Sequence, residues 1–325
     1  MPAEPAGILP ACRNCGGGGL RRVAAALRNS PGAVLHCPSC DLGMLEDFPR
    51  DQELAAFYDE EYRRSFSARP GQSSDPERLF ADYKDYQAGR IARLTPYLKP
   101  DARLLEIGCS AGMFLHHAAP LVKEAFGIDF DSAGAAHAAR VSGAKTFSSP
   151  LPKTGLPKRS FDVICLFQTL EHIPRPAESL REVARWLRPG GTVCVEVPNL
   201  NDPLLTLYDV PAYRNFYYHS AHLWYFSPKS LRAVLESAGF KGEVQFVQDY
   251  NFLNHLHWHH RNAPQPSNRD GMGPARLPLS DSAPAEAREA LSRWAAEADA
   301  AYKAVLAAHR QTENIAFIGN SGANP

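Results

Sequence analysis

The sequence predicts an α/β fold built on a mainly parallel sheet. An apolar run at 104–107 leads into glycines at positions 108 and 112 and then into a helical pattern, which is the order strand, tight turn, helix. A second expected strand, at 125–130, contains Asp129 near its end, seventeen residues after Gly112. The alternation continues within 160–176, where an expected strand runs into a loop with Glu171 and His172. An expected helix at 177–187 and an expected strand at 192–198 follow.

The turn after the first strand is predicted to hold a cofactor that contains a ribose. Gly108 and Gly112 let the backbone turn sharply and approach a ligand without interference from a β-carbon. Asp129 stands where a carboxylate can accept hydrogen bonds from both ribose hydroxyls. The G-x-G-x-x-G spacing of dinucleotide sites is absent, so a dinucleotide is not the first expectation.

Three segments resemble class I S-adenosylmethionine (SAM) methyltransferases of the methyltransferase-23 type. Glu106-x-Gly108-x-Ser110-x-Gly112 is similar to their E-x-G-x-G-x-G motif, with Ser110 in place of the middle glycine. Residues 161–199 resemble their F-D-x-V…L-E-H…L-R-P-G-G…x-V-P-N pattern, and 226–240 resembles the helix before their sixth strand. The resemblance covers roughly two thirds of the chain, a span typical of one domain. It implies a Rossmann-like sheet of seven strands and SAM as the cofactor.

The resemblance also implies a set of cofactor contacts. Gly108, Ser110 and Gly112 would form the turn beside the methionine part of SAM, Glu106 would order that turn, and Asp129 would bind the ribose. The third strand is not followed by the acid that often contacts adenine in this family, so stacking by Phe147 or a hydrogen bond from Ser148 is the expected substitute. The complete predicted set is Glu106, Gly108, Cys109, Ser110, Gly112, Asp129, Phe130, Phe147, Gln168 and Glu171.

The amino-terminal segment predicts a structural zinc site. Cys12 and Cys15 form one C-x-x-C pair, and Cys37 and Cys40 form a second. Two such pairs can complete a tetrahedral shell around one Zn²⁺, and so short a segment would need the metal to fold. A disulfide pair and a redox pair are the less favoured alternatives, because the chain is expected to be cytoplasmic and a redox site needs a single pair.

The composition narrows the class of partner. Lys plus Arg equals Asp plus Glu, at 35 each, which disfavours a broad phosphate-binding surface for nucleic acid. The sequence starts without a secretion signal and contains no run of about twenty apolar residues, so a cytoplasmic chain without membrane contact is expected. The expected domains are a zinc ribbon at 1–48, a helical linker or lid at 49–95, and a methyltransferase domain at 96–325 with an insert at 250–310 between strands six and seven.

The sequence makes separate structural predictions for two parts of the insert. The histidine-rich stretch at 255–260 is predicted to be a loop rather than a second metal site, because no carboxylate stands at a fixed helical spacing from it. From about Pro284 to His309 a long alanine-rich helix is expected, with its apolar residues along one stripe.

Residues 209–227 are predicted to bind the methyl acceptor. This aromatic- and histidine-rich segment resembles the Y-H-E-H-x-x-Y-F-S segment of deoxysugar C-methyltransferases, in which a histidine and a tyrosine transfer protons. His222 and Tyr225 fall on matching positions, while Ala221 replaces the glutamate and His219 is displaced by one place. Either histidine is a candidate base, and His172 is a lesser one; a packed aromatic wall with structural histidines is the alternative.

The sequence therefore predicts SAM-dependent methyl transfer to a small hydroxylated acceptor, such as a sugar, a nucleotide sugar or a glycosylated metabolite. O- and C-methylation both stay open, as does the oligomeric state. Two other functions compete with it: a nucleic-acid-directed methyltransferase that uses the ribbon for recognition, and a non-catalytic scaffold that keeps the fold.

Overall fold

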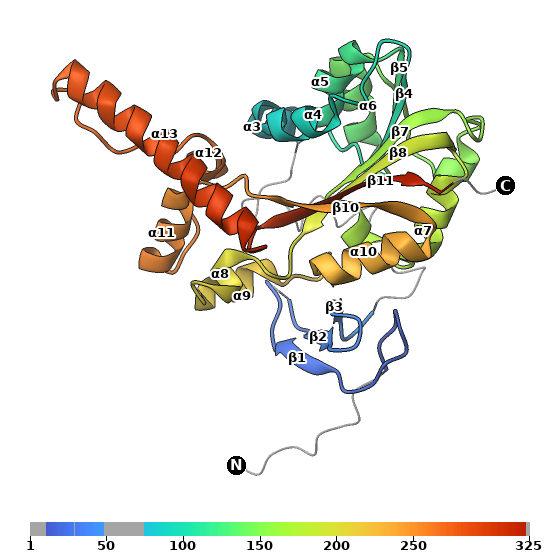
Figure 1. Cartoon of the computed structure of the whole chain (residues 1–325), viewed down its shortest axis with the longest axis horizontal. Coiled ribbons are helices and arrows are strands. Elements are labelled where there is room, and N and C mark those ends of the chain that lie inside the picture. The colour runs from blue at the N-terminus through green and yellow to red at the C-terminus, as the bar shows by residue number, and fades with distance from the viewer. Residues whose placement is uncertain (1–10, 29, 49–74, 323–325) are drawn as a thin grey trace.

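The computed structural model describes residues 11–28, 30–48 and 75–322, and these contain one large sheet and one small sheet (Figure 1). The large sheet has seven strands in the order β10-β11-β8-β7-β4-β5-β6, which confirms the Rossmann-like seven-stranded fold. Its strands are β4 (Arg103–Ile107), β5 (Glu124–Ile128), β6 (Lys145–Phe147), β7 (Phe161–Phe167), β8 (Leu187–Pro198), β10 (Phe240–Val247) and β11 (Asn314–Ser321).

The strand directions place a ligand site at one edge of this sheet. β4 pairs in parallel with β5 on one side and with β7 on the other, so the strand order reverses at β4. β11 runs antiparallel between β8 and β10. In open α/β sheets ligands bind outside the carboxyl ends of the strands at such a reversal, which here is the end that carries the glycine turn.

Helices cover both faces of the large sheet. Helices α3 to α6 lie on one face, and α7 and α10 lie on the other (Figure 1). α10 begins with a capping box formed by Ser227 and Ser230, which satisfies backbone N–H groups at the helix start. The first group of helices is α3 (Pro76–Tyr83), α4 (Ala88–Leu94), α5 (Met113–Ala118) and α6 (Ser132–Ser142), and the second is α7 (Pro176–Ala184) and α10 (Pro228–Ser237).

The remaining helices form two smaller groups. Three of them lie between the sixth and seventh strands, and the longest, α13, extends away from the rest of the molecule (Figure 1). None of the described helices is long and apolar enough to cross a membrane. These helices are α8 (Pro203–Thr206), α9 (Pro211–Tyr217), α11 (Phe252–Arg261), α12 (Asn268–Met272) and α13 (Ala285–Ala308).

The small sheet joins the amino-terminal segment to the rest of the protein. β1 (Arg21–Ala24), β2 (Val34–Cys37) and β3 (Leu42–Leu45) form an antiparallel ribbon, and β9 (Trp224–Phe226) adds a fourth strand against β3. Apolar side chains of β3 and β9 belong to the same buried cluster as β7 and β8. The ribbon is therefore packed into the core on the α7 and α10 face rather than tethered loosely.

Two sequence expectations on local structure were wrong. The histidine-rich stretch at 255–260 lies in helix α11, not in a loop, because the Asn251 side chain caps the helix start and Trp258 is buried on one face. β8 begins at Leu187, earlier than expected, because Leu187 pairs with Phe161 before an irregularity at the glycines. The first part of the expected linker, 49–74, lies outside the described residues.

Candidate active site

The glycine turn between β4 and α5 has the backbone that the sequence predicts. Gly108 and Gly112 have φ values of 78° and 88°, and Ser110 between them has φ 46°. A β-carbon on Gly108 would overlap the Thr169 side chain, and one on Gly112 would lie 2.6 Å from Cα of Ala138. Both positions therefore require glycine, whereas Ser110 bears the left-handed conformation at a cost of roughly 1–2 kcal/mol.

Asp129 lies beside this turn, at the carboxyl end of β5. Its carboxylate accepts hydrogen bonds from the backbone N–H groups of Ser110, at 2.7 Å, and of Asp131, at 2.8 Å. These bonds tie the second strand to the glycine turn and hold the carboxylate in one orientation. A carboxylate fixed at this place fits the ribose-binding role expected from the sequence.

Glu106 is buried beneath the turn, and its carboxyl group has an unusually high pKa. Burial raises its pKa to about 8, against the lowering influence of Arg90, and the charge of Asp129 raises it further. Its Oε2 atom makes no hydrogen bond within the described residues. A buried carboxylate that lacks a partner fits a site for a cationic group, such as the amino group of the methionine part of SAM.

The other residues that the sequence predicts as cofactor contacts lie in different environments near the glycine turn. Cys109 is buried, with its sulfur against Gly127, so only its backbone faces the turn. Phe130 is 53% exposed just after Asp129, and Phe147 is partly buried at the end of β6. Gln168 follows β7 in a left-handed conformation and donates to Asn314 Oδ1 at 3.0 Å. Phe130 and Phe147 are thus apolar residues close to Asp129, whose backbone N–H donates to the Phe147 carbonyl at 3.1 Å.

A buried ion-pair network behind the site was missed in the sequence. Arg90 of α4 donates twice to Oε1 of Glu196 on β8, at 2.9 and 2.7 Å, and Arg93 pairs with the other oxygen. The Glu196 side chain is fully buried, and these two cations hold its pKa low despite the burial. The network fastens α4 over the sheet. Its only sequence signal is two arginines on one face of a short helix, which does not identify the partner.

A carboxylate and two histidines meet at the carboxyl end of β7. Glu171 Oε1 lies 3.8 Å from Nε2 of His172 and 3.8 Å from Nε2 of His222. His172 Nδ1 faces the Ala221 carbonyl at 2.8 Å, so that nitrogen carries the proton and Nε2 faces Glu171. These three side chains could hold one divalent cation, and their donor atoms lie within 4.8 Å of one another.

Burial keeps all members of this group neutral near pH 7. It raises the pKa of Glu171 to about 8 and lowers that of His172 to about 4. It also lowers the pKa of His222 well below the usual range, and the neighbouring His219, His172 and Arg28 lower it further. Neither Glu171 oxygen, nor His222 Nδ1, makes a hydrogen bond within the described residues. Neutral imidazoles are in the form that accepts a proton or binds a metal.

His219 and Tyr225 lie directly against this group. The His219 and His222 rings are 3.8 Å apart between centroids. The Tyr225 hydroxyl donates to the His219 carbonyl at 2.9 Å and accepts from the His219 N–H at 2.9 Å. The structure therefore brings the four predicted catalytic residues into one cluster. His172 and His222 lie beside Glu171, while His219 and Tyr225 lie against His222. The sequence predicted Glu171 as a cofactor contact and gave no indication that it lies beside His222.

The histidine group adjoins the glycine turn. Thr169 stands two residues before Glu171, and its hydroxyl donates to the Ile107 carbonyl at 3.3 Å. The same Thr169 side chain occupies the space that a β-carbon on Gly108 would need. The predicted cofactor turn and the predicted proton acceptors thus share one edge of the sheet.

The four amino-terminal cysteines form one cluster. Cys12 Sγ lies 3.6 Å from Cys40 Sγ, and Cys15 Sγ lies 3.6 Å from Cys37 Sγ, so each close pair joins the two knuckles. All four are free thiols. Four sulfurs bound to Zn²⁺ at about 2.3 Å in a tetrahedron lie ~3.8 Å apart, close to these separations. The cluster therefore fits the structural zinc site expected from the sequence.

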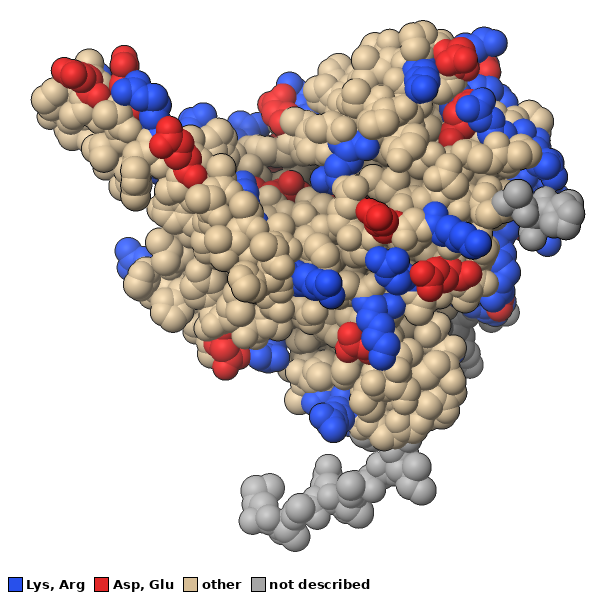
Figure 2. Space-filling view, in the orientation of Figure 1, with Lys and Arg blue, Asp and Glu red and all other residues tan. Residues whose placement is uncertain are grey.

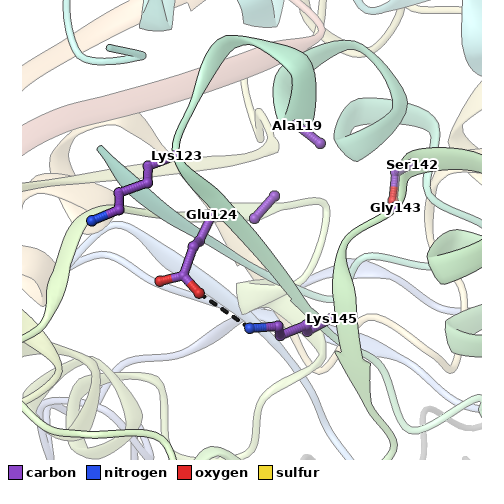
Figure 3. Close-up of a pocket in the computed structure, with 7 residues that line it drawn as sticks. Ala119, Lys123, Glu124, Ser142, Gly143 and Lys145 are labelled. Carbon is purple, nitrogen blue, oxygen red and sulfur yellow. Dashed lines mark hydrogen bonds and ion pairs between the residues drawn. The ribbon is translucent and has the colours of Figure 1, made fainter. Parts of the chain in front are cut away.

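An open pocket elsewhere does not belong to this site. It lies at the amino ends of β5 and β6, where Lys145 and Glu124 form an ion pair at 3.1 Å (Figure 3). The glycine turn lies at the opposite ends of the strands. The pocket is lined by Ala119, Lys123, Glu124, Ala125, Ser142, Gly143 and Lys145, none of which is a predicted site residue.

A comparison of the sequence with known protein families assigns this chain to one of them. The family described as a methyltransferase domain matches residues 79–244, just over half of the chain. The chain belongs to this methyltransferase family. The matched range contains the glycine turn, Asp129 and the whole histidine group, so the family assignment covers the site described above.

Individual relatives match shorter parts of this methyltransferase. A probable SAM-dependent methyltransferase of Mycolicibacterium smegmatis is 36% identical over 97 residues, which are 30% of this chain and 38% of that protein. A ubiquinone biosynthesis O-methyltransferase of Xanthomonas campestris is 28% identical over 143 residues, 40% of this chain and 53% of that protein. The chain thus spans well under two thirds of these relatives. Among solved structures, a SAM-dependent methyltransferase from Archaeoglobus fulgidus has a TM-score of 0.48 at 19% identity, covering 75% of this chain and 97% of that one.

Proposed function

We propose that this protein transfers a methyl group from SAM to a hydroxyl or an acidic carbon of a small hydroxylated acceptor. The observation that carries the proposal is the shared edge of the sheet, where the glycine turn and the group around Glu171 adjoin. Gly108 and Thr169 join the two directly. In-line displacement depends mainly on such close placement of donor and acceptor.

SAM supplies an electrophilic methyl group on a sulfonium centre. For a hydroxyl acceptor, the oxygen forms the new bond to the methyl carbon while the carbon–sulfur bond breaks and its electron pair stays on sulfur. The proton released by the acceptor goes to a neutral imidazole. His222 is the proposed acceptor of that proton, with His219 as the alternative, because burial keeps both in the unprotonated form.

A sugar or a glycosylated metabolite is the proposed acceptor class. Its support is the likeness of residues 209–227 to the acceptor segment of deoxysugar C-methyltransferases, together with the Tyr225 ring that lies against His222. O-methylation is favoured over C-methylation by the relative from Xanthomonas campestris, which is named as an O-methyltransferase. For the ribbon we propose one structural Zn²⁺ bound by the four-cysteine cluster.

A nucleic-acid substrate has less support. Lysine and arginine side chains are interspersed with acidic ones over the face shown in Figure 2, without a continuous basic surface. The balanced composition of 35 basic and 35 acidic residues agrees with this. Nucleic acid binding would require a basic track that neutralises several phosphates.

The decisive experiment is mass spectrometry of acceptors after incubation with the protein and methyl-labelled SAM. The panel contains sugars, sugar nucleotides and hydroxylated aromatic compounds, and calorimetry measures SAM binding in parallel. A labelled acceptor that disappears with the Asp129→Ala variant supports the proposal. Absence of SAM binding by the wild-type protein would refute it and would leave the scaffold function.

A further inference from the structure

Arg28 reaches from the ribbon into the predicted acceptor segment. It lies between β1 and β2, and its backbone N–H donates to the Tyr218 carbonyl at 2.7 Å. Its guanidinium lies over the Phe216 ring, 4.0 Å from the centroid. The ribbon therefore contributes a cation to a segment that is nearly two hundred residues away in the sequence.

This cation lacks an acidic partner. Within the described part of the chain, its guanidinium forms neither an ion pair nor a hydrogen bond, although the side chain is partly buried. The titratable groups with the greatest influence on it are three phenols, Tyr213, Tyr225 and Tyr250, and burial lowers its pKa. By contrast, the exposed Arg22 of the same ribbon pairs with Glu46 at 2.6 Å.

Arginine keeps its charge at physiological pH, and the partly buried side chain of Arg28 holds its guanidinium against Phe216 instead of extending it freely into solvent. A planar guanidinium with unused N–H donors matches the geometry of a carboxylate or a phosphate. The position beside the predicted proton acceptors means that the missing anion would belong to the acceptor molecule. This step rests on the proposed function.

We propose that Arg28 binds an oxyanion of the methyl acceptor, so that the substrate is a hydroxylated compound bearing a phosphate or a carboxylate. The ribbon then has a role in substrate choice in addition to its structural zinc. The specificity-determining residue lies in the amino-terminal unit, while the methyl donor binds in the family domain.

The test uses nuclear magnetic resonance of the full chain with ¹⁵N-labelled histidine. Inorganic phosphate and acetate are titrated separately at one fixed pH while the His219 and His222 signals are followed. Wild type should show saturable shifts of these signals with at least one of the two anions. In Arg28→Gln the apparent affinity should fall about tenfold or more. Arg22→Gln is the matched control on the same ribbon and should behave as wild type.

The outcomes separate this inference from the proposed function. A response to phosphate alone identifies a phosphorylated acceptor, and a response to acetate alone identifies a carboxylate. No response in wild type, or the same response in Arg28→Gln, overturns the inference. SAM binding by calorimetry and zinc content are measured on each variant, so a folding defect is recognised. If the wild-type protein binds SAM but neither anion, the methyltransferase proposal stands and only the proposed role of Arg28 is refuted.

Discussion

Gly43 of the ribbon lies opposite Tyr225 in adjacent antiparallel strands, and no other residue fits there without a shift. A β-carbon on Gly43 would lie 2.9 Å from Cβ of Tyr225. Tyr225 in turn holds the backbone of His219 through two hydrogen bonds. The ribbon is thus linked through a single strand pair to the predicted proton acceptors.

Gly43→Ala should therefore weaken both stability and activity. The added methyl group forces β3 away from β9, which we expect to lower the free energy of unfolding by about 1–3 kcal/mol. Gly18→Ala is the matched control, because a β-carbon there meets no atom within 4 Å. Urea denaturation of both variants tests this, and equal stabilities would contradict the strand contact.

Loss of the zinc that we propose for the ribbon should affect binding of the acceptor more than binding of SAM. Cys40→Ser removes one ligand of the four-cysteine cluster, so we expect loss of one zinc per chain and partial unfolding of β1 to β3. Because β3 holds β9, turnover should fall by about tenfold or more while the SAM dissociation constant changes little. Elemental analysis and calorimetry measure the two effects. Cys165→Ala, in the large sheet, should keep the zinc.

The buried carboxylates should make the protein less stable as the pH rises. Burial raises the pKa of Glu106 and of Glu171 to about 8, above their unfolded value of 4.5. Their neutral forms are therefore favoured by folding, and this stability is complete below pH 4.5 and lost as the pH rises through 8. Urea denaturation between pH 5 and 9 should show a shallower loss for Glu171→Gln than for wild type. Glu178→Gln, on the exposed side of α7, should retain the wild-type slope.

Replacing His222 should remove most of the catalytic rate without removing SAM. His222→Ala is expected to lower turnover by about 10²-fold or more, since a positioned base contributes that much to proton transfer. SAM affinity should be unchanged, as measured by calorimetry. His309→Ala, at the exposed end of α13, serves as the control. Full turnover in His222→Ala would transfer the base role to His219, which the corresponding His219→Ala variant then tests.

Removing one of the two arginines that pair with Glu196 should strongly lower the free energy of unfolding. Arg93→Ala leaves the fully buried Glu196 carboxylate with Arg90 alone, so we expect a destabilisation of about 3–5 kcal/mol. Arg78→Ala breaks an exposed pair with Asp82 and should cost at most about 1 kcal/mol. Thermal or urea unfolding of the two variants gives the comparison. A small effect of Arg93→Ala would mean that Arg90 compensates fully.

Much of the fold could be predicted because its signals are local. The strand, turn and helix around Gly108 follow from apolar runs and glycines that are close in sequence, and the seven-stranded sheet follows from the family motifs. The histidine-rich stretch at 255–260 was assigned wrongly because its helix depends on a cap at Asn251 and on burial of Trp258. Histidine itself has little preference for helix or loop.

The sequence alone determined the residues of the glycine turn and of the four-cysteine cluster, since both depend on short, regular spacings. Only the tertiary structure decided which distant groups meet. The pairing of β3 with β9, the grouping of Glu171 with His222 and the contact of Arg28 with Phe216 all join residues that are far apart in the chain. Such contacts depend on how packed elements dock against one another, and pairing partners of this kind leave no periodic signal in a single sequence.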